Sequence, residues 1–404
     1  MAEEPENISH AQTEPAEPAS PVAPSTASPV QSVNAKDHVG GPLEGIALCL
    51  SGGGYRAMLF HTGTIWRLNE AGLLPKLNRV SSVSGGSITA GMLALKWGQL
   101  SFDSGGAASN YRELVVEPIR RLAGKTLDAV SVISGALLPG SIADKVAGEY
   151  RSYLYGDATL QDLPDKPHFI INATNVQTGS LWRFSKPYMG DWQVGLIDRP
   201  KTQLAMAVTA SSAFPPVLSP FELDLSDEDY SDKDAQYHRE PFTTRVILTD
   251  GGVYDNLGLE TAWKNYKTIL VSDGGGKMSA EAEPKRDWLR HTKRILDLID
   301  NQVRSLRKRQ VINSYVSGER AGAYWGIRTN IKDYGLADSL PCDFKKTTRL
   351  ADLATRLKGL EDEDQELLIN WGYAVCDAAI RRHLDGSLRA PSESDLPYPS
   401  RTLR

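Results

Sequence analysis

The sequence predicts an α/β fold, in which a mostly parallel central sheet carries helices on both faces and a helical extension follows at the C-terminus. Short apolar segments that suit buried strands alternate with longer segments of helical periodicity. Four of these strands also run directly into turns rich in glycine. With 404 residues, 41% of them hydrophobic, the chain is long enough for one large domain of this kind or for two.

The first predicted strand covers residues 45–50 and opens into a glycine loop ahead of a predicted helix over residues 58–70. Bare N–H groups and a helix N-terminus together favour an anion. The anion is either a pyrophosphate, because Gly52, Gly54 and Ala57 satisfy the dinucleotide pattern, or the oxyanion of an acyl-transfer intermediate. The next strand ends without the carboxylate that would hold a ribose, so the oxyanion is favoured.

The second predicted strand, residues 78–83, ends at Ser84, and residues 86–97 have a helical composition. A serine on a sharp strand-to-helix turn is a nucleophile elbow. Because such a turn strains the backbone, the residues two before and two after must be small, and here they are Ser82 and Gly86. This pattern predicts that Ser84 is a nucleophile.

A carboxylate ends each of two later β-branched strands. Residues 245–249 lead to Asp250 with a two-glycine turn, and residues 268–272 lead to Asp273 with a similar turn. Either turn alone is typical of an ordinary strand end, because Asp-Gly is a favoured turn pair. In this chain order, however, a glycine loop, an elbow serine and a strand-end aspartate are the groups that acyl transfer by a serine with a carboxylate base requires.

In these three segments the chain resembles the patatin-like phospholipases, lipid acyl hydrolases with a Ser-Asp dyad and a patatin-like α/β fold. The resemblance spans roughly residues 44–276. It favours Asp250 over Asp273 as the base, because only the turn after Asp250 continues to Asn256 as in the family. The implied catalytic residues are Ser84 and Asp250; the implied oxyanion loop is Gly52, Gly53, Gly54 and Gly85; and the supporting residues are Arg56, Ser82, Gly86, Gly251, Gly252 and Asn256.

The resemblance implies hydrolysis of acyl esters of lipids, as by a phospholipase A, a lysophospholipase or a non-specific lipid acyl hydrolase, without a cofactor or a metal. Three alternatives stay open. A Ser-His-Asp esterase would add His291 or His383, although both lie in basic helical segments. A nucleotide-binding oxidoreductase would use the loop from Gly52 to Gly54. A non-catalytic scaffold would keep the fold alone.

The remaining segments predict the domain organisation. A mainly helical region covers residues 110–160, and strands follow near 168–173, 180–184 and 217–223. We expect a disordered tail over residues 1–42, a catalytic domain over 43–280 with a helical insertion at about 103–165, a helical extension over 281–390 that packs on this domain, and a loose tail over 391–404.

Two apolar segments have competing interpretations. Residues 126–139 form either a core helix or a lip that shelters an acyl chain, and we slightly favour the core. Residues 285–311 predict a basic amphipathic helix, which either lies on an anionic membrane or packs its apolar stripe on the domain. We favour packing for this helix, which leaves peripheral contact with a membrane as the second option.

Charge and cysteine content exclude some partners. The first 40 residues carry six acidic side chains and one basic side chain, a net of −5 that equals the formal charge of the whole chain. The rest is close to neutral, so we expect a lipid or acyl-ester substrate and no nucleic acid. Three scattered cysteines, no visible signal peptide and no long apolar segment predict a cytoplasmic protein, and the sequence sets no oligomeric state.

Overall fold

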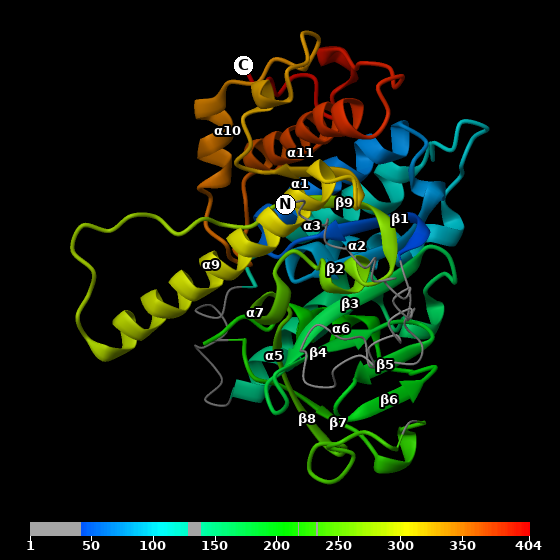
Figure 1. Ribbon diagram of the computed structural model, residues 1–404, viewed down its shortest axis with the longest axis vertical. Helices are drawn as coiled ribbons and strands as arrows, with labels where there is room; N and C mark the ends of the chain where they lie inside the picture. Colours follow the sequence, from blue (N-terminus) through cyan, green and yellow to red (C-terminus); the bar gives the residue numbers. More distant parts are fainter. Residues whose placement is uncertain (1–41, 128–138, 217, 232) are drawn as a thin grey trace, which may run out of the picture. The chain divides into compact units, whose positions relative to one another are not determined.

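A computed structural model describes residues 42–127, 139–216, 218–231 and 233–404 (Figure 1). The predicted disordered tail lies outside the described residues, except for its last residue. Most of the apolar segment 126–139 also lies outside them, so neither of its two interpretations is addressed below.

The described residues form a ten-stranded sheet. Its strands are β1 (Leu43–Leu50), β2 (Leu77–Val83), β3 (His168–Asn175), β4 (Ser180–Phe184), β5 (Tyr188–Asp191), β6 (Gly195–Asp198), β7 (Phe221–Asp224), β8 (Arg245–Asp250), β9 (Tyr266–Asp273) and β10 (Ala321–Gly326).

The sheet is parallel in its centre and antiparallel beyond β3. The central strands run in the order β10-β9-β1-β2-β3, and each neighbouring pair is parallel. Strands β4, β5 and β6 continue the order as antiparallel neighbours. The predicted parallel sheet is therefore confirmed for the centre, whereas β5 and β6 were not anticipated.

Strand β8 has a different place from the one that an all-parallel arrangement would give it. It pairs with β3 in the antiparallel sense and carries β7 on its other edge. Strand β2 pairs with the first part of β3, up to Val83 opposite Asn172. Strand β8 pairs with the rest of β3, starting with Asp250 opposite Ala173. The carboxyl ends of β2 and β8 therefore meet end to end along one strand.

Ten helices of the described residues surround this sheet. They are α1 (Gly54–Glu70), α2 (Gly85–Lys96), α3 (Glu117–Ala123), α5 (Pro139–Tyr150), α6 (Leu204–Ser211), α7 (Gly252–Asp255), α8 (Glu260–Trp263), α9 (Trp288–Val316), α10 (Phe344–Ala351) and α11 (Asp362–His383). Short π-helical and 3-10 turns join several of them.

The alternation of side chains along β1 explains why helices cover both faces. Leu48 and Leu50 point into the larger core, which α1, α2 and α11 complete. Ala47 and Cys49 point the other way, into a smaller core with residues of α8 and α9. A central parallel strand that is apolar at every position is buried on both sides. Cys49 packs there as a small apolar side chain, as its place in the strand predicts.

The C-terminal region contributes to the sheet as well as to the helical layer. Strand β10 pairs with β9 at the sheet edge, so the predicted helical extension over 281–390 also adds a strand that was not predicted. Helix α11 packs along α1, where Arg67 and Asp377 form a buried ion pair at 2.9 Å (Figure 1). The end of the chain is also ordered against α11, because Leu396 and Leu403 are buried and Asn370 donates to the Tyr398 carbonyl. The prediction of a loose tail over 391–404 is therefore wrong.

Helix α9 differs from its prediction in another way. Its apolar stripe does not pack on the domain, since Trp288, Leu296 and Ile299 are all exposed. Amphipathicity in a sequence identifies an apolar face but not the surface that covers it. Among the described helices, α9 included, none is long and apolar enough to cross a bilayer.

Candidate active site

Ser84 occupies a strained position between β2 and α2. Its φ of 51° and ψ of −120° lie outside the conformations that residues other than glycine normally adopt. The surrounding structure holds it there: its N–H donates to Ser211 Oγ at 3.0 Å, and its carbonyl accepts the N–H of Ser87 at 2.8 Å. The side chain is 8% exposed. The predicted elbow is thus present in the backbone geometry.

Close packing explains why small residues flank Ser84. A Cβ on Gly85 would lie 2.2 Å from the Gly54 carbonyl oxygen, so no larger residue fits where the two loops touch. Gly86 donates its N–H to the Ser51 carbonyl at 3.1 Å, which joins the elbow to the end of β1. Ser82 is buried and accepts a hydrogen bond from Ser87 Oγ at 3.0 Å.

Asp250 lies beside Ser84 because β2 and β8 meet on adjacent residues of β3. The Asp250 carboxyl is 2% exposed, accepts the Gly252 N–H on Oδ1 at 2.7 Å, and lies close enough to the Ser84 side chain to interact with it. Burial raises the pKa of Asp250 to about 7 even though the Gly252 N–H and the Ser84 side chain favour the carboxylate. Near neutral pH this group can therefore take up and return a proton.

The turn after Asp250 connects it to the glycine loop. A Cβ on Gly251 would lie 2.2 Å from the Asn172 carbonyl oxygen, so glycine is required at this crossing. Asn256 follows on the same turn, and its backbone carbonyl accepts the N–H of Gly52 at 3.0 Å. The serine, the aspartate and the glycine loop are therefore parts of one connected network.

The contact with Asn256 corrects one predicted site residue. Because the Gly52 N–H is already bonded to Asn256, it is not available to an oxyanion. The N–H groups of Gly53, Gly54 and Gly85, in contrast, donate to none of the described residues. Gly54 and Gly85 are the first residues of α1 and α2, so the positive ends of two helices add to the field at this point.

Asp273, the other strand-end aspartate, binds other residues and not Ser84. Its Oδ1 accepts Arg304 Nη2 at 3.2 Å, and its Oδ2 accepts the Tyr324 hydroxyl at 2.7 Å. Burial alone would raise the pKa of Asp273, but the Arg304 charge and these hydrogen bonds outweigh it and hold the pKa below its ordinary value. Asp273 therefore anchors α9 and stays ionised at neutral pH.

None of the described histidines completes a triad. No hydrogen bond joins a described histidine to Ser84 or Asp250; His291 is exposed on α9, and the ring of His383 packs edge-on against Tyr334. His61, near the glycine loop, is buried with Nδ1 bonded to Ser272 Oγ at 2.8 Å and Nε2 to the Ser51 carbonyl at 2.9 Å. Burial lowers the pKa of His61 to about 4, so it stays neutral.

Arg56 ties the glycine loop to two neighbouring segments. Its guanidinium is buried and donates to the Gly274 carbonyl from Nε and Nη2, and to the Leu353 carbonyl from Nη1. In addition, the N–H of Tyr55 donates to the Arg356 carbonyl at 3.1 Å. The segment after α10 therefore lies on the glycine loop, a contact that the sequence did not indicate.

We predict that Arg56→Lys lowers kcat for ester hydrolysis roughly 10- to 100-fold with little change in KM, because one ammonium cannot span both carbonyls and the loop shifts. Steady-state kinetics on a short ester measure this. Arg328→Lys is the matched control, since Arg328 holds the Ala351 carbonyl at 2.9 Å and makes no bond to the glycine loop. Equal losses in the two variants would assign the effect to the segment around α10 instead.

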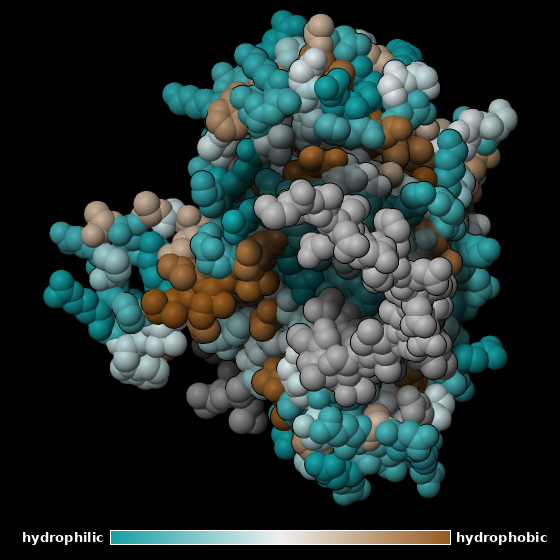
Figure 2. Space-filling model, in the orientation of Figure 1, coloured by the Kyte–Doolittle hydropathy of each residue, from teal (hydrophilic) through white to brown (hydrophobic). Residues whose placement is uncertain are grey.

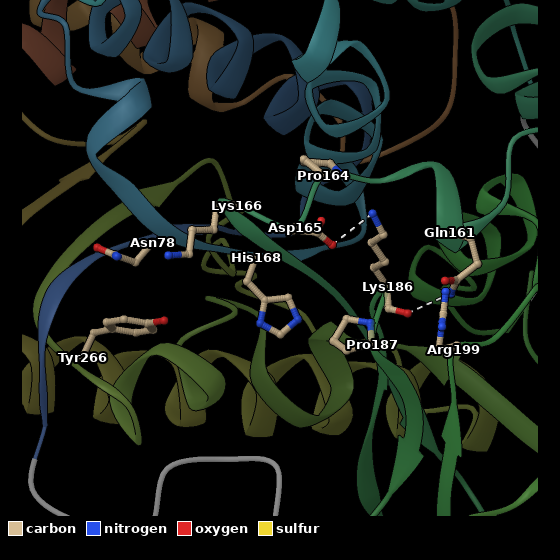
Figure 3. Close-up of a pocket in the computed structure, with 10 residues that line it drawn as sticks. All are labelled: Asn78, Gln161, Pro164, Asp165, Lys166, His168, Lys186, Pro187, Arg199 and Tyr266. Atoms are coloured by element: carbon tan, nitrogen blue, oxygen red, sulfur yellow. Dashed lines mark hydrogen bonds and ion pairs between the residues drawn. The ribbon is translucent and has the colours of Figure 1, made fainter.

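A separate cavity of about 520 Å³ lies at the opposite edge of the sheet (Figure 3). Its lining includes Asn78, His168 and Tyr266, from the amino ends of β2, β3 and β9, whereas Ser84 follows the carboxyl end of β2. Figure 3 shows Lys186 and Asp165 pointing toward each other across one side, where they form an ion pair at 3.0 Å. This cavity is therefore not the site around Ser84.

Comparison with known proteins gives one family. The model of the patatin-like phospholipase family matches residues 48–263, more than half of the chain. No curated protein sequence matches it.

Two solved structures show a weak likeness to this chain. Human GIVD cytosolic phospholipase A2 in complex with methyl γ-linolenyl fluorophosphonate is 15% identical, with a TM-score of 0.46 over 83% of this chain and 58% of that chain. VipD from Legionella pneumophila is 16% identical, with a TM-score of 0.33 over 82% of this chain and 66% of that chain. This chain thus spans less than two thirds of the length of either structure.

Proposed function

Because this chain belongs to the patatin-like phospholipase family, we propose that it hydrolyses acyl ester bonds of lipids with Ser84 as nucleophile and Asp250 as base. The observation that carries the proposal is the position of the strained Ser84 beside the buried Asp250, where β2 and β8 meet on β3. The activity we expect is that of a phospholipase A, a lysophospholipase or a non-specific lipid acyl hydrolase.

In the first half of the proposed reaction, Ser84 Oγ attacks the ester carbonyl carbon and its proton passes to Asp250. The N–H groups of Gly53, Gly54 and Gly85 stabilise the oxyanion, and preorganised donors of this kind are worth about 3 kcal/mol each. When the tetrahedral intermediate collapses, the carbon–oxygen bond to the alcohol breaks, and Asp250 returns the proton to the leaving alkoxide. An acyl-Ser84 ester remains.

In the second half, water takes the place of the alcohol. Asp250 accepts a proton from the water molecule while the water oxygen attacks the acyl carbonyl carbon. The same glycine N–H groups stabilise the new oxyanion. Breakdown releases the fatty acid, and Ser84 Oγ recovers its proton from Asp250. A group that both accepts and returns a proton works best when its pKa is near the working pH. Burial gives Asp250 such a pKa.

The pH dependence of hydrolysis tests this assignment. We predict that kcat/KM for p-nitrophenyl butyrate rises with pH to a plateau, with a midpoint of about 7, because only ionised Asp250 can act as the base. At pH 5 the rate should be about 100-fold below the plateau. Absence of ester hydrolysis at any pH would contradict the proposed function and favour a non-catalytic scaffold. Full activity at pH 5 would keep the hydrolase but exclude Asp250 as its base.

A further inference from the structure

Helix α9 presents an apolar face that the described residues leave uncovered. Of its 29 residues, all of them described, only Val311 and Ser314 are buried, while Trp288 is 80%, Leu296 59% and Ile299 51% exposed. Figure 2 shows apolar atoms gathered where Figure 1 places the middle of α9. The exposed apolar side chains of the helix are Trp288, Leu289, Ile295, Leu296, Leu298, Ile299, Val303, Leu306, Ile312 and Val316.

Five of these side chains form one stripe. Trp288, Ile295, Ile299, Val303 and Leu306 are separated by seven, four, four and three residues, which places them on one face of a helix. At 1.5 Å per residue this stripe is about 27 Å long. Monomeric proteins seldom expose an apolar surface of this extent, and such surfaces mark sites of interaction.

The second half of α9 is fixed beside the active site. Arg304 donates to Asp273 and to the Gly276 carbonyl, and Arg307 donates to Glu260 Oε2 at 3.0 Å. Helix α7, which begins two residues after Asp250, packs against α9 and carries the exposed Val253. Added to the effect of burial, the charge of Asp300 on α9 raises the pKa of Asp250, so the middle of the helix lies near the site.

The charge of α9 is opposite to that of the chain. The helix carries seven basic side chains and two acidic ones, a net of +5, whereas the chain as a whole carries −5. Lys308 and Arg309 follow the stripe, and Arg290 and Lys293 lie beside it with only exposed partners, Asp287 and Asp297. Exposed ion pairs of this kind contribute little to stability, so the cations remain accessible to other anions.

We propose that α9 docks on lipid bilayers that contain anionic lipids, with its apolar stripe in the boundary between headgroups and acyl chains. The bilayer then lies close to Ser84, so that a lipid can reach it without crossing water. That the bilayer supplies the substrate rests on the proposed function. That α9 is the surface that binds the bilayer rests on its exposed stripe and its charge. A second copy of the chain is a poorer occupant, because it would bring another helix of net charge +5 against the first.

Flotation with vesicles tests the proposal on the full chain. The probes are vesicles of phosphatidylcholine alone and vesicles with about 30% phosphatidylserine. Wild type should bind the second kind and lose most of that binding in about 0.5 M salt. Ile295→Asp with Ile299→Asp should lower the partition constant about 100-fold, since two exposed side chains of the stripe no longer enter the bilayer. Neither side chain is buried, so folding should be unaffected.

The matched control is Leu43→Asp with Phe344→Asp, which places two aspartates at exposed apolar positions away from α9. It should bind vesicles like wild type. Unchanged binding in the α9 variant, or equal loss in the control, would overturn the proposal. The proposal would also be overturned if light scattering showed that the wild type is a dimer that does not bind vesicles, and that the α9 variant is a monomer.

Hydrolysis of p-nitrophenyl butyrate, which is dissolved in water, separates this inference from the proposed function. The α9 variant should keep that hydrolysis while its hydrolysis of phospholipid in vesicles falls. Ester hydrolysis without vesicle binding would overturn the docking proposal alone. Vesicle binding through α9 without any ester hydrolysis would support docking and reject the catalytic proposal.

Discussion

Ser84→Ala should lose at least about 1,000-fold in kcat for ester hydrolysis while its thermal unfolding stays close to that of wild type. The variant removes the oxygen that forms the acyl ester and leaves the oxyanion loop intact. Alanine also tolerates the strained backbone no worse than serine, since neither has a favoured conformation at a φ of 51°. Fatty acid release and differential scanning calorimetry measure the two effects.

Ser87→Ala is the control for Ser84→Ala. Ser87 has the same hydroxyl three residues further along α2, and its Oγ bonds to Ser82 and Ser211 rather than to Asp250. Its loss should lower kcat by no more than about 10-fold, because it affects the support of the elbow and not the reacting atoms. Equal and complete losses in both variants would indicate that the elbow collapsed, and retained activity in Ser84→Ala would reject the nucleophile.

Asp250→Asn should lower kcat about 1,000-fold, since an amide cannot take the serine proton. Asp273→Asn is the matched control. It removes the other strand-end carboxylate, which Arg304 and Tyr324 hold, and should keep most of the turnover despite lower stability. The reverse result would reject the base.

The same Asp250→Asn variant should be stabilised, and more so at high pH. The carboxyl has a pKa of about 7 in the folded protein and about 3.9 in an unfolded chain. Between these values the folded state holds a proton that the unfolded state has lost, so stability declines as pH rises through 7. Because asparagine does not titrate, the stability of the variant lacks this dependence on pH. Its gain in Tm over wild type should be larger at pH 8 than at pH 4, and a gain independent of pH would contradict the raised pKa.

Local rules explain why the reacting residues could be predicted from the sequence. Ser84 and Asp250 each end a strand and precede glycine, and steric limits on such turns are visible in a few neighbouring residues. In a parallel sheet, where the carboxyl ends of the strands share one edge, two such residues lie close together. The structure brings them together differently, with β8 antiparallel to β3 and end to end with β2.

Contacts between distant segments explain what the sequence could not give. Nothing in the glycine loop itself indicates that the Gly52 N–H is taken by Asn256, or that Arg56 reaches Leu353. Strand β10 is six residues long with two glycines, too weak a pattern to separate from the helices around it. The stripe of α9 was visible in the sequence, but its exposure depends on what the rest of the chain places beside it.

Covalent labelling with a fluorophosphonate, followed by peptide mapping, tests the central claim most directly. An activated serine displaces the fluoride and keeps the phosphonate on its oxygen, and an ordinary serine does not react. We predict a single adduct on Ser84 in wild type, strongly reduced labelling in Asp250→Asn and unaltered labelling in Asp273→Asn. An adduct on Ser82 or Ser87, or an unlabelled protein that is fully folded, would contradict the assignment of Ser84 as the nucleophile.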